Sequence, residues 1–113
     1  MTLANKTILL TGGTSGIGEA CARHFASLGA NLYVASNQAE AGCALETELA
    51  SAGNSVRFIE TDVADEASVQ SLLQAIADEA GCLHAAHLNA GVWGKGKVTD
   101  FTDADWDKLM GVN

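Results

Sequence analysis

Short apolar runs alternate with amphipathic segments along this chain. Residues 6–11, 31–35 and 55–60 are rich in aliphatic and β-branched residues and have the length of strands. The first is apolar on both faces, as a buried parallel strand is, and the third alternates between apolar and polar positions. A weaker run covers residues 83–88. The pattern therefore predicts four strands.

Helical periodicity occupies the segments that follow these strands. The Ala-, Glu- and Leu-rich stretch 40–52 predicts one helix, Asp65 is a candidate N-cap of the next, and residues 102–105 resemble a capping box for the last. Three helices are predicted to end at glycines, namely Gly29, Gly53 and Gly81. The apolar stripes predicted to face the core are Ile17, Cys21, Phe25 and Leu28, then Val69, Leu72, Leu73, Ile76 and Ala80.

The alternation of strands and helices predicts an α/β fold. Strands and helices at this spacing build a parallel sheet with helices on both faces. We expect a Rossmann-like three-layer α/β/α domain over residues 1–113, with about four strands in the order 3-2-1-4. The glycine-rich residues 91–96 are interpreted as a loop after the fourth strand.

Composition and charge narrow the possible partners. The chain is 48% hydrophobic and 18% charged, and its apolar runs are far shorter than the roughly 20 residues that span a bilayer. Residues 1–6 lack the pattern of a signal peptide, so we expect a cytoplasmic location and no membrane partner. A net charge of −8 argues against nucleic acid as a partner.

The cysteines and histidines do not indicate a metal site. Cys21, Cys43 and Cys82 are widely separated, without the close pairs that zinc sites use. His84 and His87 lie in a predicted strand, where they would point to opposite faces. We interpret the cysteines as reduced thiols that act as small hydrophobic residues.

The stretch TGGTSGIG, residues 11–18, joins the first strand to the first helix. Gly12 can form the turn, while Gly16 and Gly18 allow close approach of a ligand and of the helix to the sheet. Backbone N–H groups at a helix start bind anions, so the loop predicts a phosphate site. No lysine follows the last glycine, which disfavours a triphosphate site. A tight turn without a ligand is the alternative that the glycines leave open.

Four motifs together resemble the short-chain dehydrogenase/reductase family. They are TGGTSGIG, Asp62-Val63 after the third strand, Leu88-Asn89-Ala90-Gly91 after the fourth, and the segment Trp106 to Asn113. Their order and structural context match the nicotinamide-dependent Rossmann family over nearly the whole chain. The resemblance implies NAD or NADP as cofactor.

The resemblance also implies roles for individual residues. The pyrophosphate and adjacent ribose would be surrounded by Gly12, Thr14, Ser15, Gly16, Ile17 and Gly18. The adenosine ribose would face Ser36 and Asn37, and the adenine would meet Asp62 and Val63. Asn89, Ala90 and Gly91 would lie along the nicotinamide side, and Asn113 would belong to the catalytic set, where the family uses it to hold a water in a proton relay.

The sequence departs from the family pattern in its catalytic residues. The family's serine and Tyr-x-x-x-Lys pair lie beyond the position of Asn113, and Tyr33 falls inside a predicted strand. Hydride transfer to a carbonyl needs a proton donor, which that tyrosine supplies in the family. We therefore expect a truncated Rossmann domain that is inactive by itself.

The choice between NAD and NADP stays open. An acidic residue after the second strand would accept from the ribose 2′-hydroxyl, and an arginine would pair with a 2′-phosphate. The sequence has Ser36, Asn37 and Gln38 at that place, and Ser15 stands where NADP-preferring relatives often carry arginine.

The fourth strand is the last departure. His84 stands where relatives usually have Asp, and Leu88 replaces the first Asn of their motif. In a full-length relative a fifth strand would cover this strand, and here we expect a bare edge, which is a template for pairing.

Three functions remain in view: the NAD(P)-binding half of a reductase, a module that forms homo-oligomers through the strand-four edge or helix faces without cofactor, and a fragment of an active carbonyl reductase or alcohol dehydrogenase.

Overall fold

A parallel four-stranded sheet forms the centre of the protein. The computed structural model describes residues 2–92 and 96–113. The strands lie in the order β3-β2-β1-β4, which confirms the predicted α/β fold and strand order. Their bounds are β1 (Thr7–Thr11), β2 (Asn31–Ser36), β3 (Val56–Glu60) and β4 (Ala85–Leu88).

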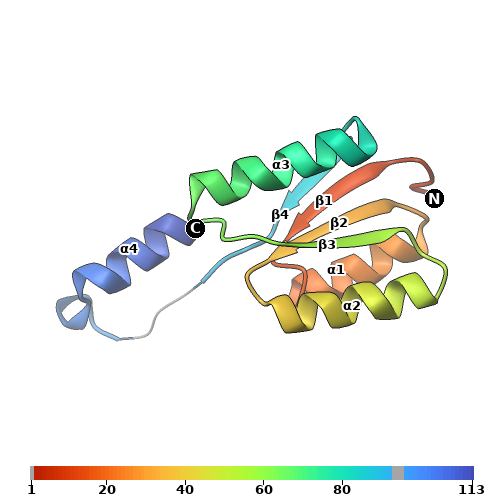
Figure 1. Ribbon diagram of the computed structural model, residues 1–113. Coiled ribbons are helices and arrows are strands. Elements are labelled where there is room, and N and C mark those ends of the chain that lie inside the picture. Colours follow the sequence, from red (N-terminus) through yellow and green to blue (C-terminus); the bar gives the residue numbers. More distant parts are fainter. Residues whose placement is uncertain (1, 93–95) are drawn as a thin grey trace.

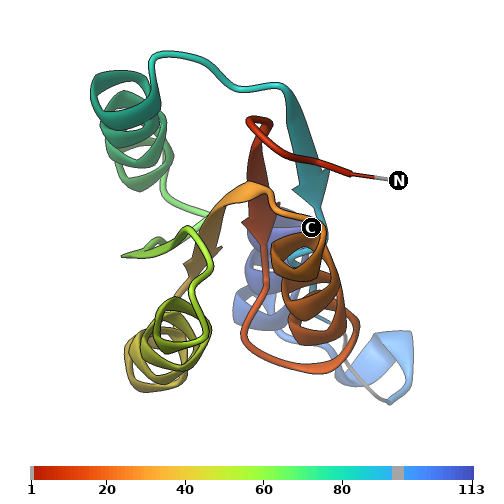
Figure 2. The same ribbon diagram turned by 90° about the vertical axis from the view of Figure 1, so that its right-hand side faces the viewer.

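Helices cover both faces of this sheet. α1 and α2 lie on one face and α3 on the other, which gives the three predicted layers (Figures 1 and 2). α4 projects beyond the carboxyl ends of the strands (Figure 1). The helices are α1 (Gly16–Ser27), α2 (Ala39–Ser51), α3 (Glu66–Ala80) and α4 (Asp103–Val112).

The segment between β4 and α4 differs from a plain loop. A short 3-10 helix, η1 (Val98–Asp100), precedes α4 and was not predicted. Residues 93–95 of the predicted glycine-rich loop lie outside the described residues. Within the described part of the chain, no helix is both long and apolar enough to cross a membrane.

The two central strands are buried on both faces, as the sequence predicts for the first strand. All five residues of β1 are buried, and five of the six in β2. Successive side chains of a strand point to opposite faces, so the core has two halves. On the face of α1 and α2 the buried residues are Ile8, Leu10, Ala22, Ala26, Ala30, Leu32, Val34, Leu45 and Leu49. On the face of α3 they are Leu9, Tyr33, Ala35, Leu72 and Ile76.

The buried face of α1 differs from the predicted apolar stripe. Its buried residues are Gly18, Ala22 and Ala26, spaced four apart, whereas Ile17 is 74% exposed. Cys21 and Phe25 are only partly buried at the margin of the core. Small residues at every fourth position let the helix lie close to the sheet, so volume rather than hydrophobicity selects this face.

The predicted role of the cysteines holds for one of the three. All three are free thiols, and only Cys21 packs against the core. Cys43 and Cys82 are exposed, so they do not act as small buried hydrophobic residues.

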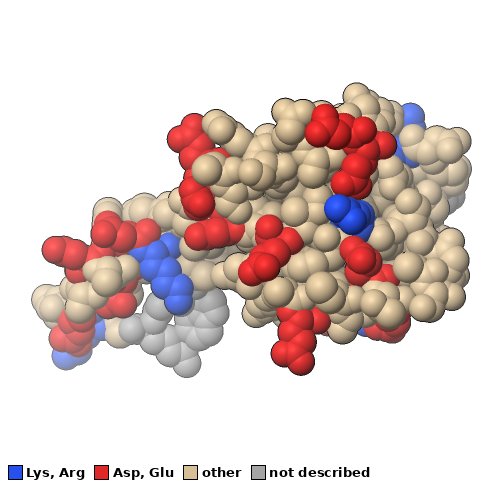
Figure 3. All heavy atoms as spheres, in the orientation of Figure 1, with Lys and Arg blue, Asp and Glu red and all other residues tan. Residues whose placement is uncertain are grey.

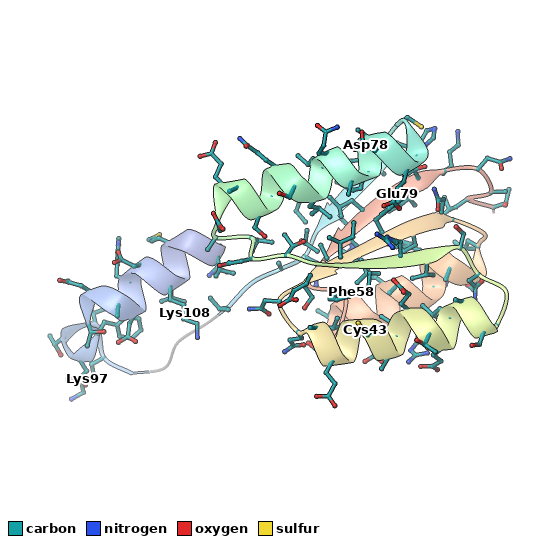
Figure 4. The ribbon with its side chains drawn as sticks, viewed as in Figure 1. Cys43, Phe58, Asp78, Glu79, Lys97 and Lys108 are labelled. Atoms are coloured by element: carbon teal, nitrogen blue, oxygen red, sulfur yellow. The ribbon has the colours of Figure 1, made fainter. Side chains whose placement is uncertain are left out.

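A glutamate closes the β3 edge of the sheet. The carboxylate of Glu46, on α2, accepts a hydrogen bond from the backbone N–H of Phe58 on β3. Leu32 and Thr61 donate across the β2–β3 ladder to Ser55 and Ser36, so Phe58 lies at an alternate position whose N–H points away from β2. Close packing brings α2 near enough, because a Cβ at Gly42 would lie 2.1 Å from the Phe58 ring (Figure 4 labels Phe58).

A histidine ring joins the beginnings of β1 and β4. The Thr7 backbone N–H donates to His84 Nδ1 at 2.8 Å, while the His84 N–H donates to the Thr7 carbonyl at 2.9 Å. The His84 ring accepts the hydrogen bond from the Thr7 N–H in place of a backbone carbonyl. β4 therefore begins at Ala85 rather than at residue 83. His87 contacts α1 instead, with its ring centroid 6.1 Å from that of Phe25.

Replacing His84 by alanine tests this contact. The partly buried Thr7 N–H would lose its acceptor, so we expect His84→Ala to lower the free energy of unfolding by about 1 kcal/mol. His84→Asp supplies another acceptor and should retain most of the stability. Urea denaturation measures both. Equal losses in the two variants would show that the acceptor at this position is unimportant.

A buried tyrosine links the sheet to α3. Tyr33 is 4% exposed, and its hydroxyl donates to Glu79 Oε1 at 3.4 Å. Glu79 Oε2 pairs with Arg57 on β3 at 3.3 Å (Figure 4 labels Glu79). Burial, followed by the charge of Glu79, raises the pKa of Tyr33 above its usual value near 10.

This shift predicts a loss of stability in alkali. Because the pKa of Tyr33 is higher in the folded chain, the unfolded chain releases the proton first. The contribution to stability is therefore full below about pH 10 and is lost as the pH rises through the folded pKa. Tyr33→Phe should lack this component, which urea denaturation between about pH 8 and 11 detects. Parallel pH curves for the two proteins would contradict the assignment.

Candidate functional site

A cavity lies at the carboxyl ends of the parallel strands, the place where open α/β sheets bind ligands. Its volume is about 560 Å³. It is lined by twelve of the thirteen residues that the sequence assigns to the dinucleotide, namely Gly12, Thr14, Ser15, Gly16, Ile17, Ser36, Asn37, Asp62, Val63, Asn89, Ala90 and Gly91.

The thirteenth residue, Gly18, lies behind the cavity wall. A Cβ at Gly18 would lie 1.9 Å from the carbonyl oxygen of Gly12, so no side chain fits there. Gly12 turns the chain out of β1 with φ of 68°, a left-handed conformation that favours glycine. The two glycines therefore bring the start of α1 against the end of β1, and Gly18 shapes the site without lining it.

Helix capping differs between the two α-helices that start at the cavity and the two that start elsewhere. The N-cap residues of α1 and α2, Ser15 and Gln38, line the cavity and make no side-chain cap. Asp65 caps α3 and Thr102 caps α4, as the sequence predicts, and neither lines the cavity. The first-turn N–H groups of a helix have no partner within the helix, so an uncapped start can receive an anion.

Neutral polar side chains form the wall at the end of β2. The Thr14 hydroxyl donates to Gln38 Oε1 at 2.6 Å, and its oxygen lies 3.0 Å from Ser36 Oγ. Ser36 Oγ also accepts from the Gln38 N–H at 3.1 Å. Among the residues that the structure describes, no acidic or basic side chain takes part in this network.

Asp62 is held at the cavity wall by its own turn. Its Oδ1 accepts from the Ala64 N–H at 2.9 Å, and its backbone N–H donates to Ser68 Oγ at 2.9 Å. This fixes one carboxylate oxygen and orients the group beside Val63. The arrangement offers a hydrogen-bond acceptor at the end of β3.

Side-chain contacts fix the end of β4 to the glycine loop. Asn89 Nδ2 donates to the Gly12 carbonyl at 3.2 Å, and the Ala90 N–H donates to Thr11 Oγ1 at 3.1 Å. A Cβ at Gly12 would also lie 2.9 Å from Ala90 Cα. These contacts hold the glycine loop against the end of β4.

Asn113 does not line the cavity. Its side-chain amide forms two hydrogen bonds with Val92, accepting from the N–H at 2.8 Å and donating to the carbonyl at 2.7 Å. Both polar atoms of the side chain are thus used to join the end of α4 to the segment after β4. The structure brings Asn113 next to the site through Val92, which does line the cavity.

Six further residues line the cavity and were not assigned to it from the sequence. They are Ala35, Gln38, Thr61, Val92, Lys108 and Val112. Four of them adjoin assigned residues in the chain. Lys108 and Val112 lie one helical turn apart on α4, so the helical spacing within the segment 106–113 was the signal that could have found them.

Comparison with known proteins identifies the family. A family model described as short chain dehydrogenase matches residues 6–113. This chain belongs to that family. The short chain dehydrogenase motifs recognised in the sequence are the segments that meet at the cavity.

Two similar curated proteins are named as an oxidoreductase and a dehydrogenase. An uncharacterized oxidoreductase of Escherichia coli K12 is 34% identical over 98% of this chain, and a 3beta-hydroxysteroid dehydrogenase of Mediterraneibacter gnavus is 35% identical over 96% of it. The chain spans only 42% and 40% of the length of these two curated relatives.

Solved structures of the family have the same fold. A Burkholderia phymatum short chain dehydrogenase/reductase in complex with NAD superposes with a TM-score of 0.95 at 34% identity, covering 99% of this chain and 40% of its own. A metagenomic short-chain oxidoreductase in complex with NADP has a TM-score of 0.93 at 28% identity, covering 99% of this chain and 51% of its own.

The contact at Gly18 predicts a severe effect of one methyl group. Gly18→Ala would place Cβ against the backbone oxygen of Gly12, so we expect a loss of about 1–3 kcal/mol in the free energy of unfolding. Gly111→Ala is a matched control, because its Cβ would lie 3.5 Å from the Ala64 side chain, an ordinary contact. Thermal and urea denaturation compare them. Equal stability of the two variants would contradict the packing assigned to Gly18.

Proposed function

We propose that this chain binds a nicotinamide dinucleotide, NAD or NADP, as the coenzyme-binding part of an oxidoreductase. The observation that carries the proposal is the glycine-loop cavity, at which the start of α1 has no side-chain cap. Two neutral hydroxyl-bearing residues, Thr14 and Ser15, line the cavity beside the N–H groups of the first turn of α1. The two similar structures with NAD and NADP support the same ligand class.

The residues divide the proposed ligand among the strand ends. The glycine loop would bind the pyrophosphate, Ser36 and Asn37 the adenosine ribose, and Asp62 with Val63 the adenine. Asn89, Ala90 and Gly91 would border the nicotinamide. The oriented carboxylate of Asp62 is suited to accept from the adenine amino group.

The bound coenzyme would supply or accept a hydride. The described residues contribute orientation: the strand ends fix the dinucleotide, and Asn113 holds the segment at Val92 beside it. No tyrosine is among the described residues that line the cavity, and Tyr33 is buried in β2. Carbonyl reduction would need a proton donor at the substrate oxygen, and alcohol oxidation would need a proton acceptor there. The described wall offers no tyrosine for this role. A cytoplasmic location stays a prediction.

The β4 edge favours self-association as a second activity of the 113-residue chain. Ala85 and Ala86 are exposed on this edge strand, and Leu88 is 76% exposed. An unpaired edge with apolar side chains is a template for another strand. Light scattering at increasing concentration tests this, and a monomer throughout would reject it.

Calorimetric titration with NADH and NADPH tests coenzyme binding. Asp62→Asn keeps an oxygen for the Ala64 N–H but turns an amide donor toward the adenine, so we expect roughly tenfold weaker binding. Asp78→Asn is the control, because Asp78 lies on α3 and does not line the cavity (Figure 4). Failure of the unsubstituted chain to bind either dinucleotide at millimolar concentration would reject the proposed function.

A further inference from the structure

We propose that Lys108 of α4 contacts a phosphate group of the bound dinucleotide and helps to select anionic ligands. The inference rests on the coenzyme binding proposed above and assigns a residue outside the glycine loop and the strand ends. The ligand chemistry is a phosphate on the adenosine half or at the centre of the molecule.

The charges around the cavity single out Lys108. Among the lining residues that the structure describes, only Asp62 and Lys108 carry an ionisable side chain. All other lining residues are glycine, aliphatic or neutral polar residues. Lys108 is thus the single cation of this described wall.

The ammonium group of Lys108 forms no ion pair with a carboxylate among the described residues. The ion pairs among residues 2–92 and 96–113 involve Arg23 and Arg57, and none involves Lys108. Asp105 lies one turn before Lys108, but its carboxylate accepts from the Thr102 N–H at 3.0 Å. Hydrogen bonds from Thr102 lower the pKa of Asp105 most strongly, and the charge of Lys108 contributes least. The charge of Lys108 therefore remains available to a ligand.

The position of Lys108 on α4 lets it reach the cavity. Lys108 and Val112 lie on one face of the helix, four residues apart, and both line the cavity. Figure 4 shows the Lys108 side chain leaving α4 on the side toward the sheet. Lys97 directly precedes η1 and does not line the cavity (Figure 4 labels both lysines). A long, exposed lysine at a cavity wall can follow a phosphate as it binds.

The acidity of the protein makes a local cation important. The net charge is −8, and Figure 3 shows acidic side chains spread over the sheet-and-helix body and over α4, with few basic ones. A dinucleotide brings further negative charge. At an ionic strength near that of cells, charges beyond about 8 Å are largely screened, so one cation at the cavity outweighs distant carboxylates.

Four proteins and three ligands test the proposal. The proteins are the unsubstituted chain, Lys108→Gln, Lys108→Arg and the control Lys97→Gln, each checked for folding by circular dichroism. The ligands are adenosine, 5′-ADP and 2′,5′-ADP, titrated by calorimetry at two salt concentrations. Adenosine lacks phosphate, 5′-ADP carries a 5′-diphosphate, and 2′,5′-ADP carries one phosphate at the 5′ position and one at the 2′ position.

We expect Lys108→Gln to bind one or both phosphorylated ligands about three- to fivefold more weakly, with adenosine unchanged and a smaller dependence on salt. Lys108→Arg should restore the affinity, and Lys97→Gln should not change it. Equal losses for both phosphorylated ligands support a contact at the pyrophosphate, and a loss confined to 2′,5′-ADP supports one at the 2′-phosphate.

Two results would overturn the inference. The first is phosphate-ligand affinities that are the same in Lys108→Gln and Lys97→Gln, and the second is an equal loss for adenosine, which would indicate a structural effect. Absence of binding by the unsubstituted chain rejects the proposed function itself, which distinguishes that failure from failure of the Lys108 contact.

Discussion

The contact between Gly18 and the carbonyl of Gly12 is the constraint on which the site depends. Because only glycine fits at position 18, the first turn of α1 lies directly against the turn that leaves β1. The same Gly12 carbonyl accepts from Asn89, so the end of β4 is drawn to the same point. Two strand ends and one helix start are thereby positioned by a single backbone oxygen. The cavity is the space that these three elements leave in front of the sheet.

Much of this arrangement could be predicted from the sequence because local rules and tertiary packing agree. The cap at Asp65, the left-handed Gly81 and the capping box at Thr102 occur where the pattern indicates them, and the two central strands are continuous buried runs. The cavity residues could be assigned from the sequence motifs, whereas hydrophobic periodicity did not identify them. The carboxyl ends of these strands are far apart in the sequence, and they meet because the sheet is parallel.

The features that sequence reasoning missed depend on distances between elements. The buried face of α1 is its small-residue face, because helix-to-sheet distance outweighs side-chain hydrophobicity there. The ring of His84 replaces a backbone acceptor, a substitution of side chain for main chain that no propensity describes. Lys108 becomes a cavity residue only once α4 is placed beyond the strand ends. Each case is set by packing geometry rather than by residue type.

The hydrogen bond from Phe58 to Glu46 gives the sheet a direction of growth. A strand that approached β3 would have to displace a carboxylate from the middle of that edge and leave its charge against the incoming backbone. The β4 edge presents Ala85, Ala86 and Leu88 instead, with no such guard on its described residues. An additional strand would therefore meet less hindrance at the β4 edge than at the β3 edge.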